Sequence, residues 1–370
     1  MRSAVGFSLK SKKEVAFEEV CAQIKSCGIE PKIVFFFSDY TNFSFFAEKM
    51  NDYFPLAVTI GSTSYIDFTS VGCSHFGLSA LAVYEGVECS CGVLHEIDRH
   101  PLKYIDSIKR VVSELSSTEN TCCIEFCSAF TNGEELALDT FQEGFEGLNI
   151  SVVGSSSGSS EETFATAVAL NGKVYKDSCV FALVHNLNGR IFLFRENVFK
   201  PTQYTFSATD VDCEKRIVYE YDGKPAEETL KGALKLEGSE LHSYLATHPM
   251  GRIIDGKIYI TELNSILDDG AISYFGRIYS HTKMVLLEAD DFNTAWNQNS
   301  EKIRQTVPNP SFALAINCLS RSKLFEQQNK FDDFLNYVKR NVPIFVGVSG
   351  YGEQMGHGHL NQSFILIVFE

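Results

Sequence analysis

The chain has 370 residues, of which 44% are hydrophobic and 21% are charged, and its formal net charge is -15. This composition indicates a globular protein with a substantial core, and the length favours two domains. Because the surface is acidic, nucleic acid and anionic membranes are not expected as partners. No apolar run approaches the roughly 18 residues that span a bilayer. No signal peptide is predicted, so we expect a cytoplasmic protein whose 11 cysteines are reduced.

Three segments of the sequence share one pattern. Each begins with a short apolar run typical of a strand, continues with helical spacing and ends in a second apolar run that stops at glycine. A helix between two strands is a crossover that makes the strands parallel, so the pattern predicts three β-α-β units. The first runs are 32–37, 121–126 and 311–318, the helices are 43–53, 134–146 and 323–340, and the second runs end at Gly61, Gly154 and Gly347.

A further apolar run follows each of these glycines, at 78–83, 179–184 and 363–368. Asn171-Gly172 and Asn188-Gly189 lie between such runs and are typical of hairpin turns. We therefore predict that each unit adds antiparallel strands to its parallel pair.

The middle of the chain interrupts the pattern, and a domain boundary is predicted there. The predicted fold is α/β, with mixed sheets and two lobes built from the three repeated β-α-β units. The lobes are expected to cover residues 1–200 and 201–370. In the second lobe, Asp222-Gly223 predicts a turn before a helix that reaches Leu234, and 253–259 predicts a hairpin.

Short polar and glycine-containing motifs follow one another in a distinctive order, and through them the chain resembles the FIST domain family. On this resemblance, residues 1–200 are a FIST N-type domain and 201–370 a FIST C-type domain. The motifs are Gly61-Ser62-Thr63-Ser64, Gly154-Ser155-Ser156-Ser157-Gly158, Asp222-Gly223-Lys224-Pro225-Ala226, His248-Pro249-Met250-Gly251, Asn317-Cys318-Leu319-Ser320-Arg321, Gly350-Tyr351-Gly352-Glu353 and His359-Leu360-Asn361-Gln362.

The resemblance implies a sensory input module of signal transduction that binds small ligands such as amino acids. For a subset of the family it implies haem binding and nitric oxide sensing. The chain contains no kinase, cyclase or methyl-accepting segment. The output is therefore expected to pass through a separate protein, which could be a histidine kinase, a chemoreceptor or a cyclic-dinucleotide enzyme.

The strand-ending turns are predicted to line the ligand site. Ligands of such sheets bind at the carboxyl ends of strands, and backbone N–H groups in Gly/Ser turns can hold a carboxylate. The competing interpretation is that glycine merely permits tight turns or close packing. The residues predicted from these turns are Gly61, Ser62, Ser128, Gly154, Ser155 and Ser156.

The second group of predicted site residues comes from the third unit and the tail. Arg321 could pair with a ligand carboxylate, and Glu353 with an ammonium group. The competing interpretation is that these polar groups satisfy one another across a domain joint. The group consists of Arg321, Tyr351, Glu353, His359, Asn361 and Gln362.

Two alternatives to a metabolite sensor stay open, and neither a catalytic residue nor a metal site is predicted. Gly154-Ser155-Ser156-Ser157-Gly158 fits the G-x-S-x-G pattern of a serine hydrolase, which also needs a helix directly after the serine. A haem-based gas sensor needs only one axial ligand, so haem is the one cofactor considered. The conceivable axial histidines are His75, His95, His242, His248 and His359.

Overall fold

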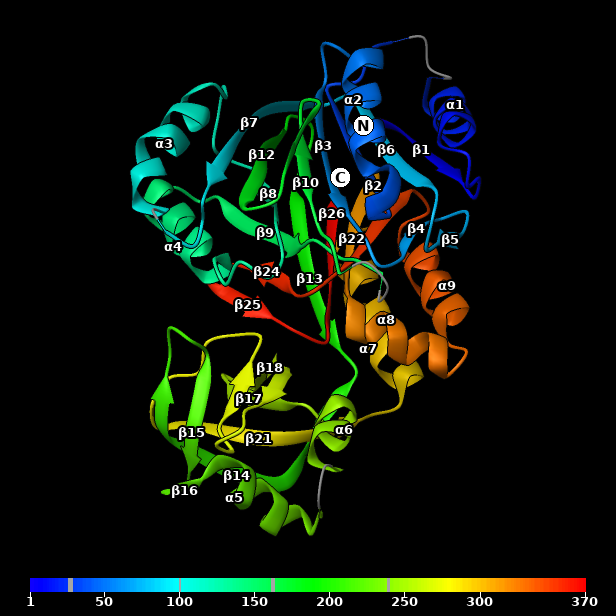
Figure 1. Ribbon diagram of the computed structural model, residues 1–370. Coiled ribbons are helices and arrows are strands. Elements are labelled where there is room, and N and C mark those ends of the chain that lie inside the picture. Colours follow the sequence, from blue (N-terminus) through cyan, green and yellow to red (C-terminus); the bar gives the residue numbers. More distant parts are fainter. Residues whose placement is uncertain (26–28, 100, 161–163, 238–239) are drawn as a thin grey trace. The chain divides into compact units, whose positions relative to one another are not determined.

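The computed structural model describes residues 1–25, 29–99, 101–160, 164–237 and 240–370 (Figure 1). This part of the chain forms two compact units. The first consists of Met1–Arg195, Asn299–His359 and Phe364–Glu370, and the second of Glu196–Gln298 and Leu360–Ser363. The predicted α/β class with mixed sheets is confirmed.

The described part of the first unit contains three six-stranded sheets, and each sheet includes the strands of one predicted β-α-β unit. The first sheet has the strand order β1-β6-β2-β3-β10-β11 and carries the helices α1 and α2. Its elements are β1 (Arg2–Ser8), α1 (Lys13–Ile24), β2 (Ile33–Ser38), α2 (Tyr40–Tyr53), β3 (Val58–Thr63), β6 (Leu78–Glu85), β10 (Val168–Leu170) and β11 (Lys173–Tyr175).

The second sheet repeats this arrangement with the order β7-β12-β8-β9-β24-β25, and it carries α3 and α4. Its two central strands, β8 and β9, are parallel like β2 and β3. The elements are β7 (Val87–His95), η2 (Pro101–Tyr104), α3 (Ile105–Ser113), β8 (Thr121–Cys127), α4 (Glu134–Gly144), β9 (Ser151–Ser156), β12 (Ser178–Asn186), β24 (Glu353–Met355) and β25 (Gly358–Leu360).

The third sheet has the equivalent order β13-β26-β22-β23-β4-β5, and α8 packs on it. Here β22 and β23 form the parallel pair. The elements are β4 (Asp67–Thr69), β5 (Cys73–Ser74), β13 (Ile191–Asn197), α7 (Phe292–Thr306), β22 (Phe312–Cys318), α8 (Leu319–Gln327), α9 (Phe331–Asn341), β23 (Phe345–Gly350) and β26 (Ser363–Phe369).

The sheets exchange strands in a cyclic way. After β3 the chain leaves the first sheet and adds β4 and β5 to the third; after β9 it adds β10 and β11 to the first; after β23 it adds β24 and β25 to the second. The expectation that each unit keeps its added strands is therefore right for β6, β12 and β26 but wrong for these short strands. Asn171-Gly172 forms the predicted hairpin between β10 and β11. Asn188-Gly189 does not form a hairpin, because β12 and β13 belong to different sheets.

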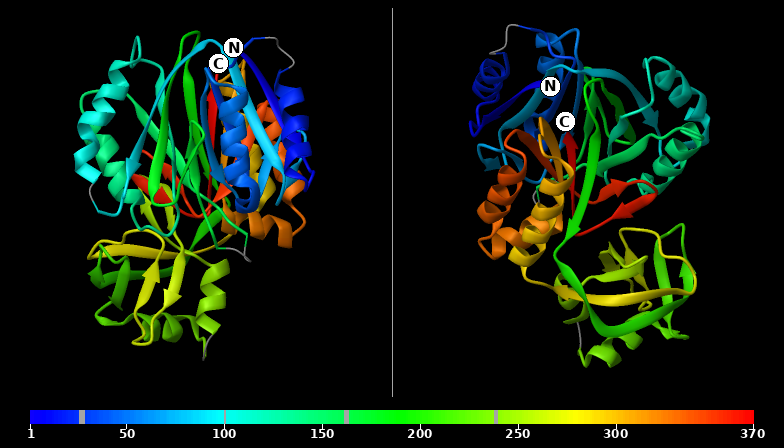
Figure 2. Two further views of the ribbon diagram at one scale, coloured as in Figure 1. Left: turned by 45° about the horizontal axis from the view of Figure 1, so that its top comes forward. Right: turned by 180° about the vertical axis from the view of Figure 1, so that it is seen from behind.

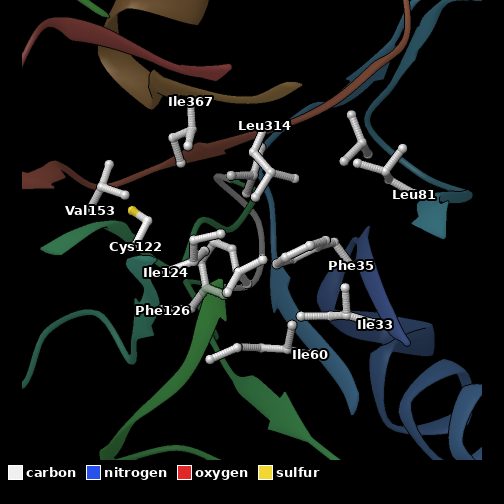
Figure 3. Packing of buried hydrophobic residues seen from close by; sticks show 14 of the residues in the cluster. Ile33, Phe35, Ile60, Leu81, Cys122, Ile124, Phe126, Val153, Leu314 and Ile367 are labelled. Carbon is white, nitrogen blue, oxygen red and sulfur yellow. The ribbon is translucent and has the colours of Figure 1, made fainter. Parts of the chain in front are cut away.

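One apolar core lies between the inner faces of the three sheets. Phe35 from β2, Phe126 from β8 and Leu314 from β22 belong to it and point toward one another (Figure 3). The alternate side chains of β2, such as Val34 and Phe36, face α1 and α2 instead. Full burial of one large apolar side chain contributes about 1.5–3 kcal/mol. Since strands of both chain halves share this core, residues 299–359 fold with the first 195 residues and not within a lobe of residues 201–370.

Helices cover the outer faces of the sheets in the first unit. In Figures 1 and 2, α1 and α2 lie on the first sheet, α3 and α4 on the second, and α8 and α9 on the third. The start of α2 is fixed by Asp39, whose carboxylate accepts a hydrogen bond from Thr41 N at 3.0 Å. No described helix combines the length and the apolar character that crossing a membrane requires.

The described part of the second unit contains an eight-stranded sheet, antiparallel in its described pairs, together with α5 and α6. The predicted Asp222-Gly223 turn and the hairpin of β17 and β18 are both present. Its core contains Phe206, Tyr221 and Leu286. The elements are β14 (Phe199–Asp212), β15 (Ile217–Tyr221), β16 (Lys224–Pro225), α5 (Ala226–Leu234), α6 (Glu240–Thr247), β17 (Met250–Ile254), β18 (Lys257–Thr261), β19 (Leu263–Ile266), β20 (Ile272–Tyr274) and β21 (Thr282–Ala289).

Candidate functional site

The three strand exchanges of the first unit meet at one place, which we call the corner ring. It comprises residues 61–65, 154–158 and 347–352, at the ends of β3, β9 and β23. Each loop forms a backbone hydrogen bond with the sheet that it enters, so the three bonds close a cycle. They run from Tyr65 N to Ser349 O (2.9 Å), from Gly158 N to Thr63 O (2.8 Å) and from Ser156 N to Gly352 O (3.0 Å).

Glycine is required in the corner ring because the backbones come so close. A Cβ atom on Gly350 would lie 1.8 Å from the carbonyl oxygen of Ser156, and one on Gly158 would lie 2.1 Å from that of Ser349. The requirement is one of space, since neither glycine has a positive φ. Gly61 has a packing role, because a Cβ there would lie 2.6 Å from the Phe36 ring.

The hydroxyl groups of the corner ring are buried, and they bond to other atoms of the ring or to buried groups packed against it. Ser64 Oγ accepts from Ser349 N at 3.0 Å, and Ser155 Oγ donates to the carbonyl of Ser156 at 2.8 Å. Ser349 Oγ lies 2.7 Å from Ser322 Oγ, and Ser62 Oγ donates to the carbonyl of Thr63. The loops converge as the sequence analysis expects, and protein atoms fill the point where they meet.

A buried chain of polar side chains extends from the ring under α4. Gln354 Nε2 donates to both His359 Nδ1 and Ser156 Oγ, each at 3.0 Å, and Ser156 Oγ donates to Glu134 Oε1 at 3.3 Å. All four side chains are buried. In the described part of the chain, Gln354 Oε1 has no hydrogen-bond partner. An unsatisfied buried acceptor costs about 1–3 kcal/mol, so this oxygen favours a ligand that donates a hydrogen bond.

Two aromatic residues lie at the solvent side of the same loops. Tyr351 belongs to the corner ring, and its hydroxyl lies 2.9 Å from Ser159 Oγ. Its ring centroid is 4.6 Å from that of Phe130, which is 53% exposed and has a φ of 65°. A bulky residue rarely adopts this left-handed conformation, and such residues cluster at functional sites. The pair therefore marks the exposed edge of the candidate site.

Arg321 and Glu353 of the first unit are fully buried. The Arg321 guanidinium, at the start of α8, lies 4.9 Å from the ring centroid of Phe325 and 5.8 Å from that of Phe364. Glu353 lies in β24, where it pairs with Ser155 of β9. Burial at these positions is consistent with a structural role for both side chains in fixing the loops of the corner ring. The contact of Arg321 and Glu353 with a ligand stays a prediction.

The other predicted residues are engaged elsewhere. Ser128 Oγ accepts from Ser178 N at 3.3 Å, next to the strand pair of β8 and β12. Asn361 and Gln362 belong to the second unit, where both bond to Glu262. Asn361 Oδ1 accepts from Glu262 N at 3.1 Å, and Gln362 Nε2 donates to Glu262 Oε1 at 3.3 Å.

Glu134, Gln354 and Phe130 are residues of the candidate site that the sequence analysis missed. Glu134 forms with Glu135 an acidic start of the helix, which by itself predicts exposure, although its side chain is buried. Gln354 directly follows the Gly350-Tyr351-Gly352-Glu353 motif, and this position was the one available signal. Phe130 lies in a loop, where a single aromatic residue has no pattern to distinguish it.

The geometry gives no support to the hydrolase or haem alternatives. No described helix begins directly after Ser156, whose Oγ bonds to Gln354 and Glu134. Of the histidines considered as axial ligands, His75 bonds Glu326 at 2.6 Å and His359 bonds Gln354. His95 lies 3.3 Å from Ser178 Oγ, and His248 stacks on Tyr244. Haem binding through any of the histidines considered stays a prediction.

These observations define a class: an α/β protein in which three strand-exchanging sheets meet in a buried polar junction, joined to a β-rich unit. The model of the FIST N domain matches residues 32–224, and that of the FIST C domain matches residues 226–356. The chain therefore belongs to the FIST family, as the motif order predicts. FIST domains are sensory modules of signal transduction.

Comparisons with individual proteins add little. No curated protein matches the chain. One solved structure is described as "Cyanuric acid hydrolase: evolutionary innovation by structural concatenation". It aligns with this chain at a TM-score of 0.34 and 8% sequence identity. The alignment covers 100% of this chain and 99% of that chain. A likeness at this level carries no argument about function.

The corner ring makes a prediction about Gly350→Ala. The added methyl group would clash with the Ser156 carbonyl, so we expect the variant to lose about 3 kcal/mol of stability or to fail to fold. Calorimetry or thermal melting measures the loss. Gly232→Ala is the control, because no atom lies within 4 Å of a Cβ there. That variant is expected to gain up to about 1 kcal/mol from helix propensity in α5. If Gly350→Ala were as stable as the wild type, this result would contradict the close backbone packing of the corner ring.

The burial of Ser156 predicts its behaviour toward hydrolase probes. An active-site fluorophosphonate is expected to leave the folded protein unlabelled, since Ser156 Oγ is inaccessible and bonds to Gln354 and Glu134. Mass spectrometry of the treated protein measures the labelling, with Ser156→Ala as the matched control. Labelling that disappears in Ser156→Ala would revive the hydrolase alternative.

Proposed function

We propose that this chain is a small-molecule-binding sensory protein whose ligand is an amino acid or a similar metabolite. Membership of the FIST family supports the sensory role. The single observation that carries the binding proposal is the fully buried Gln354, whose Oε1 lacks a hydrogen-bond partner among the described residues beside the corner ring. Buried polar groups in folded proteins are nearly always satisfied, so an unsatisfied one favours a missing ligand atom.

The residues around Gln354 favour a ligand with a donor group of positive charge. Glu134 supplies a carboxylate at the end of the polar chain, and Gln354 Oε1 supplies an acceptor. An ammonium group is a donor with no acceptor capacity, so it matches both. The aromatic faces of Tyr351 and Phe130 at the exposed edge can also attract a cation. An α-amino group is the simplest group that fits.

The corner ring supplies a route from binding to signal. Each of its loops is continuous with strands of two different sheets, through the strand exchanges. A ligand that binds one arrangement of these loops better than another shifts the population of the whole unit toward that arrangement. The output is then read by a separate protein, for which a histidine kinase, a chemoreceptor or a cyclic-dinucleotide enzyme are the candidates.

A thermal-shift screen over amino acids, small metabolites and haemin tests the proposal. A ligand present at 100 times its Kd is expected to raise the Tm by roughly 5 °C, because binding stabilises the folded state. Gln354→Met keeps the length of the side chain but removes the acceptor, so the shift should be lost. Gln305→Met is the matched control, since Gln305 is exposed on α7 and bonds Glu301.

Two outcomes would overturn this placement: no compound shifts the Tm, or the shift survives unchanged in Gln354→Met. The melting temperatures of both variants without ligand separate loss of binding from loss of stability. A Soret band after addition of haemin, absent from the histidine variant that removes its axial ligand, would instead favour the haem-based gas sensor.

A further inference from the structure

A carboxylate and two thiols lie together on the outer face of the second sheet, beneath α4. Cys127 of β8 and Cys179 of β12 are directly opposite each other in the antiparallel register, and Glu125 precedes Cys127 by two residues on the same face. All three side chains are fully buried. We call them the Glu125 cluster. It lies outside the polar chain described above, and its argument does not rest on the proposed function.

The geometry of the Glu125 cluster converges on one point. The thiols of Cys127 and Cys179 both donate to the same oxygen, Glu125 Oε2, each at 3.2 Å. One ligating atom from each residue lies within 4.8 Å of the other two. The second carboxylate oxygen, Oε1, has no hydrogen-bond partner among the described residues. Three donors that metals favour are therefore preassembled around an incompletely satisfied carboxylate.

A carboxyl group is unusual on the outer face of the second sheet because its surroundings are apolar. The outer face of this sheet is otherwise apolar, with Phe141 and Phe181 in the same core. A carboxyl group in such an apolar layer is costly unless neighbouring groups compensate it. The backbone nevertheless makes room for it: a Cβ on Gly154 would lie 2.4 Å from Glu125 Oε1. Gly154 thus has a role in admitting the carboxyl group.

We infer that the Glu125 cluster binds one Zn²⁺ ion through Cys127, Cys179 and Glu125. Zinc takes thiolate and carboxylate ligands in tetrahedral geometry, with sulfur and oxygen about 3.6 Å apart for ordinary bond lengths. The observed separations of 3.2 Å need to widen by only a few tenths of an ångström. These three residues fill three of the four tetrahedral positions around the ion.

The charge balance of the buried layer favours this binding. With Glu125 ionised and both thiols protonated, the three side chains carry a charge of minus one. Binding of Zn²⁺ releases the two thiol protons to solvent and leaves two thiolates, one carboxylate and the metal, again minus one. A divalent ion therefore enters without adding net charge to a region where unbalanced charge is costly. Because the cluster is fully buried, the ion is expected to enter as the chain folds.

Metal analysis of the full chain tests the inference. The protein is produced in zinc-supplemented medium, dialysed against a chelator and analysed by mass spectrometry for metal. We expect about one zinc per chain in the wild type and less than a tenth of that in Cys127→Ala/Cys179→Ala. The matched control is Cys122→Ala, which removes an equally buried thiol of β8 that faces the shared core of the three sheets. It should keep its zinc.

A second measurement tests the inference even if the double variant fails to fold. Refolding the wild type under reducing conditions with Co²⁺ should give near-ultraviolet thiolate-to-cobalt absorption, and Glu125→Gln should hold the ion more weakly while it keeps both thiols. The inference is overturned by any of three results. These are background zinc in the wild type together with no cobalt band, equal metal in the wild type and the double variant, or a Cys127–Cys179 disulfide in the native protein.

Discussion

The close approach of three backbones in the corner ring is the constraint on which the first unit depends. The chain passes from one sheet to the next at the ends of β3, β9 and β23, and each passage is fixed by a backbone hydrogen bond to the sheet it enters. Carbonyl oxygens of Ser156 and Ser349 occupy the positions where a side chain on Gly350 or Gly158 would begin. The same crossings set the order of strands in all three sheets, and hence the shared core behind them.

The candidate site follows from this constraint. Loops that cross at one point carry many backbone donors and small polar side chains into a buried place, and those groups must be satisfied there. Most are satisfied within the ring, but Gln354 in the adjoining polar chain is not fully satisfied. On the proposed account, the ligand completes this network. The sensor would then detect its ligand by a change in the loops that join the three sheets.

The sequence predicted the β-α-β units well, because β2, β8 and β22 are apolar runs and the helices between the strands have regular spacing. It could not predict the strand exchange. The exchanged strands have two or three residues each, too few to show a period, and their partners lie in distant parts of the chain. For the same reason, glycines at strand ends predicted that loops converge, whereas the burial of Arg321 and the unsatisfied oxygen of Gln354 depend on packing that no local pattern encodes.

The most direct test of the corner ring is hydrogen exchange at the amides of Tyr65, Ser156 and Gly158, measured residue by residue in the native protein. A closed ring predicts that these loop amides exchange as slowly as the central strands β2, β8 and β22, through global unfolding only. Exchange at the rate of solvent-exposed turns such as the one at Gly147 would contradict the account, because it would show that the three loops are not joined.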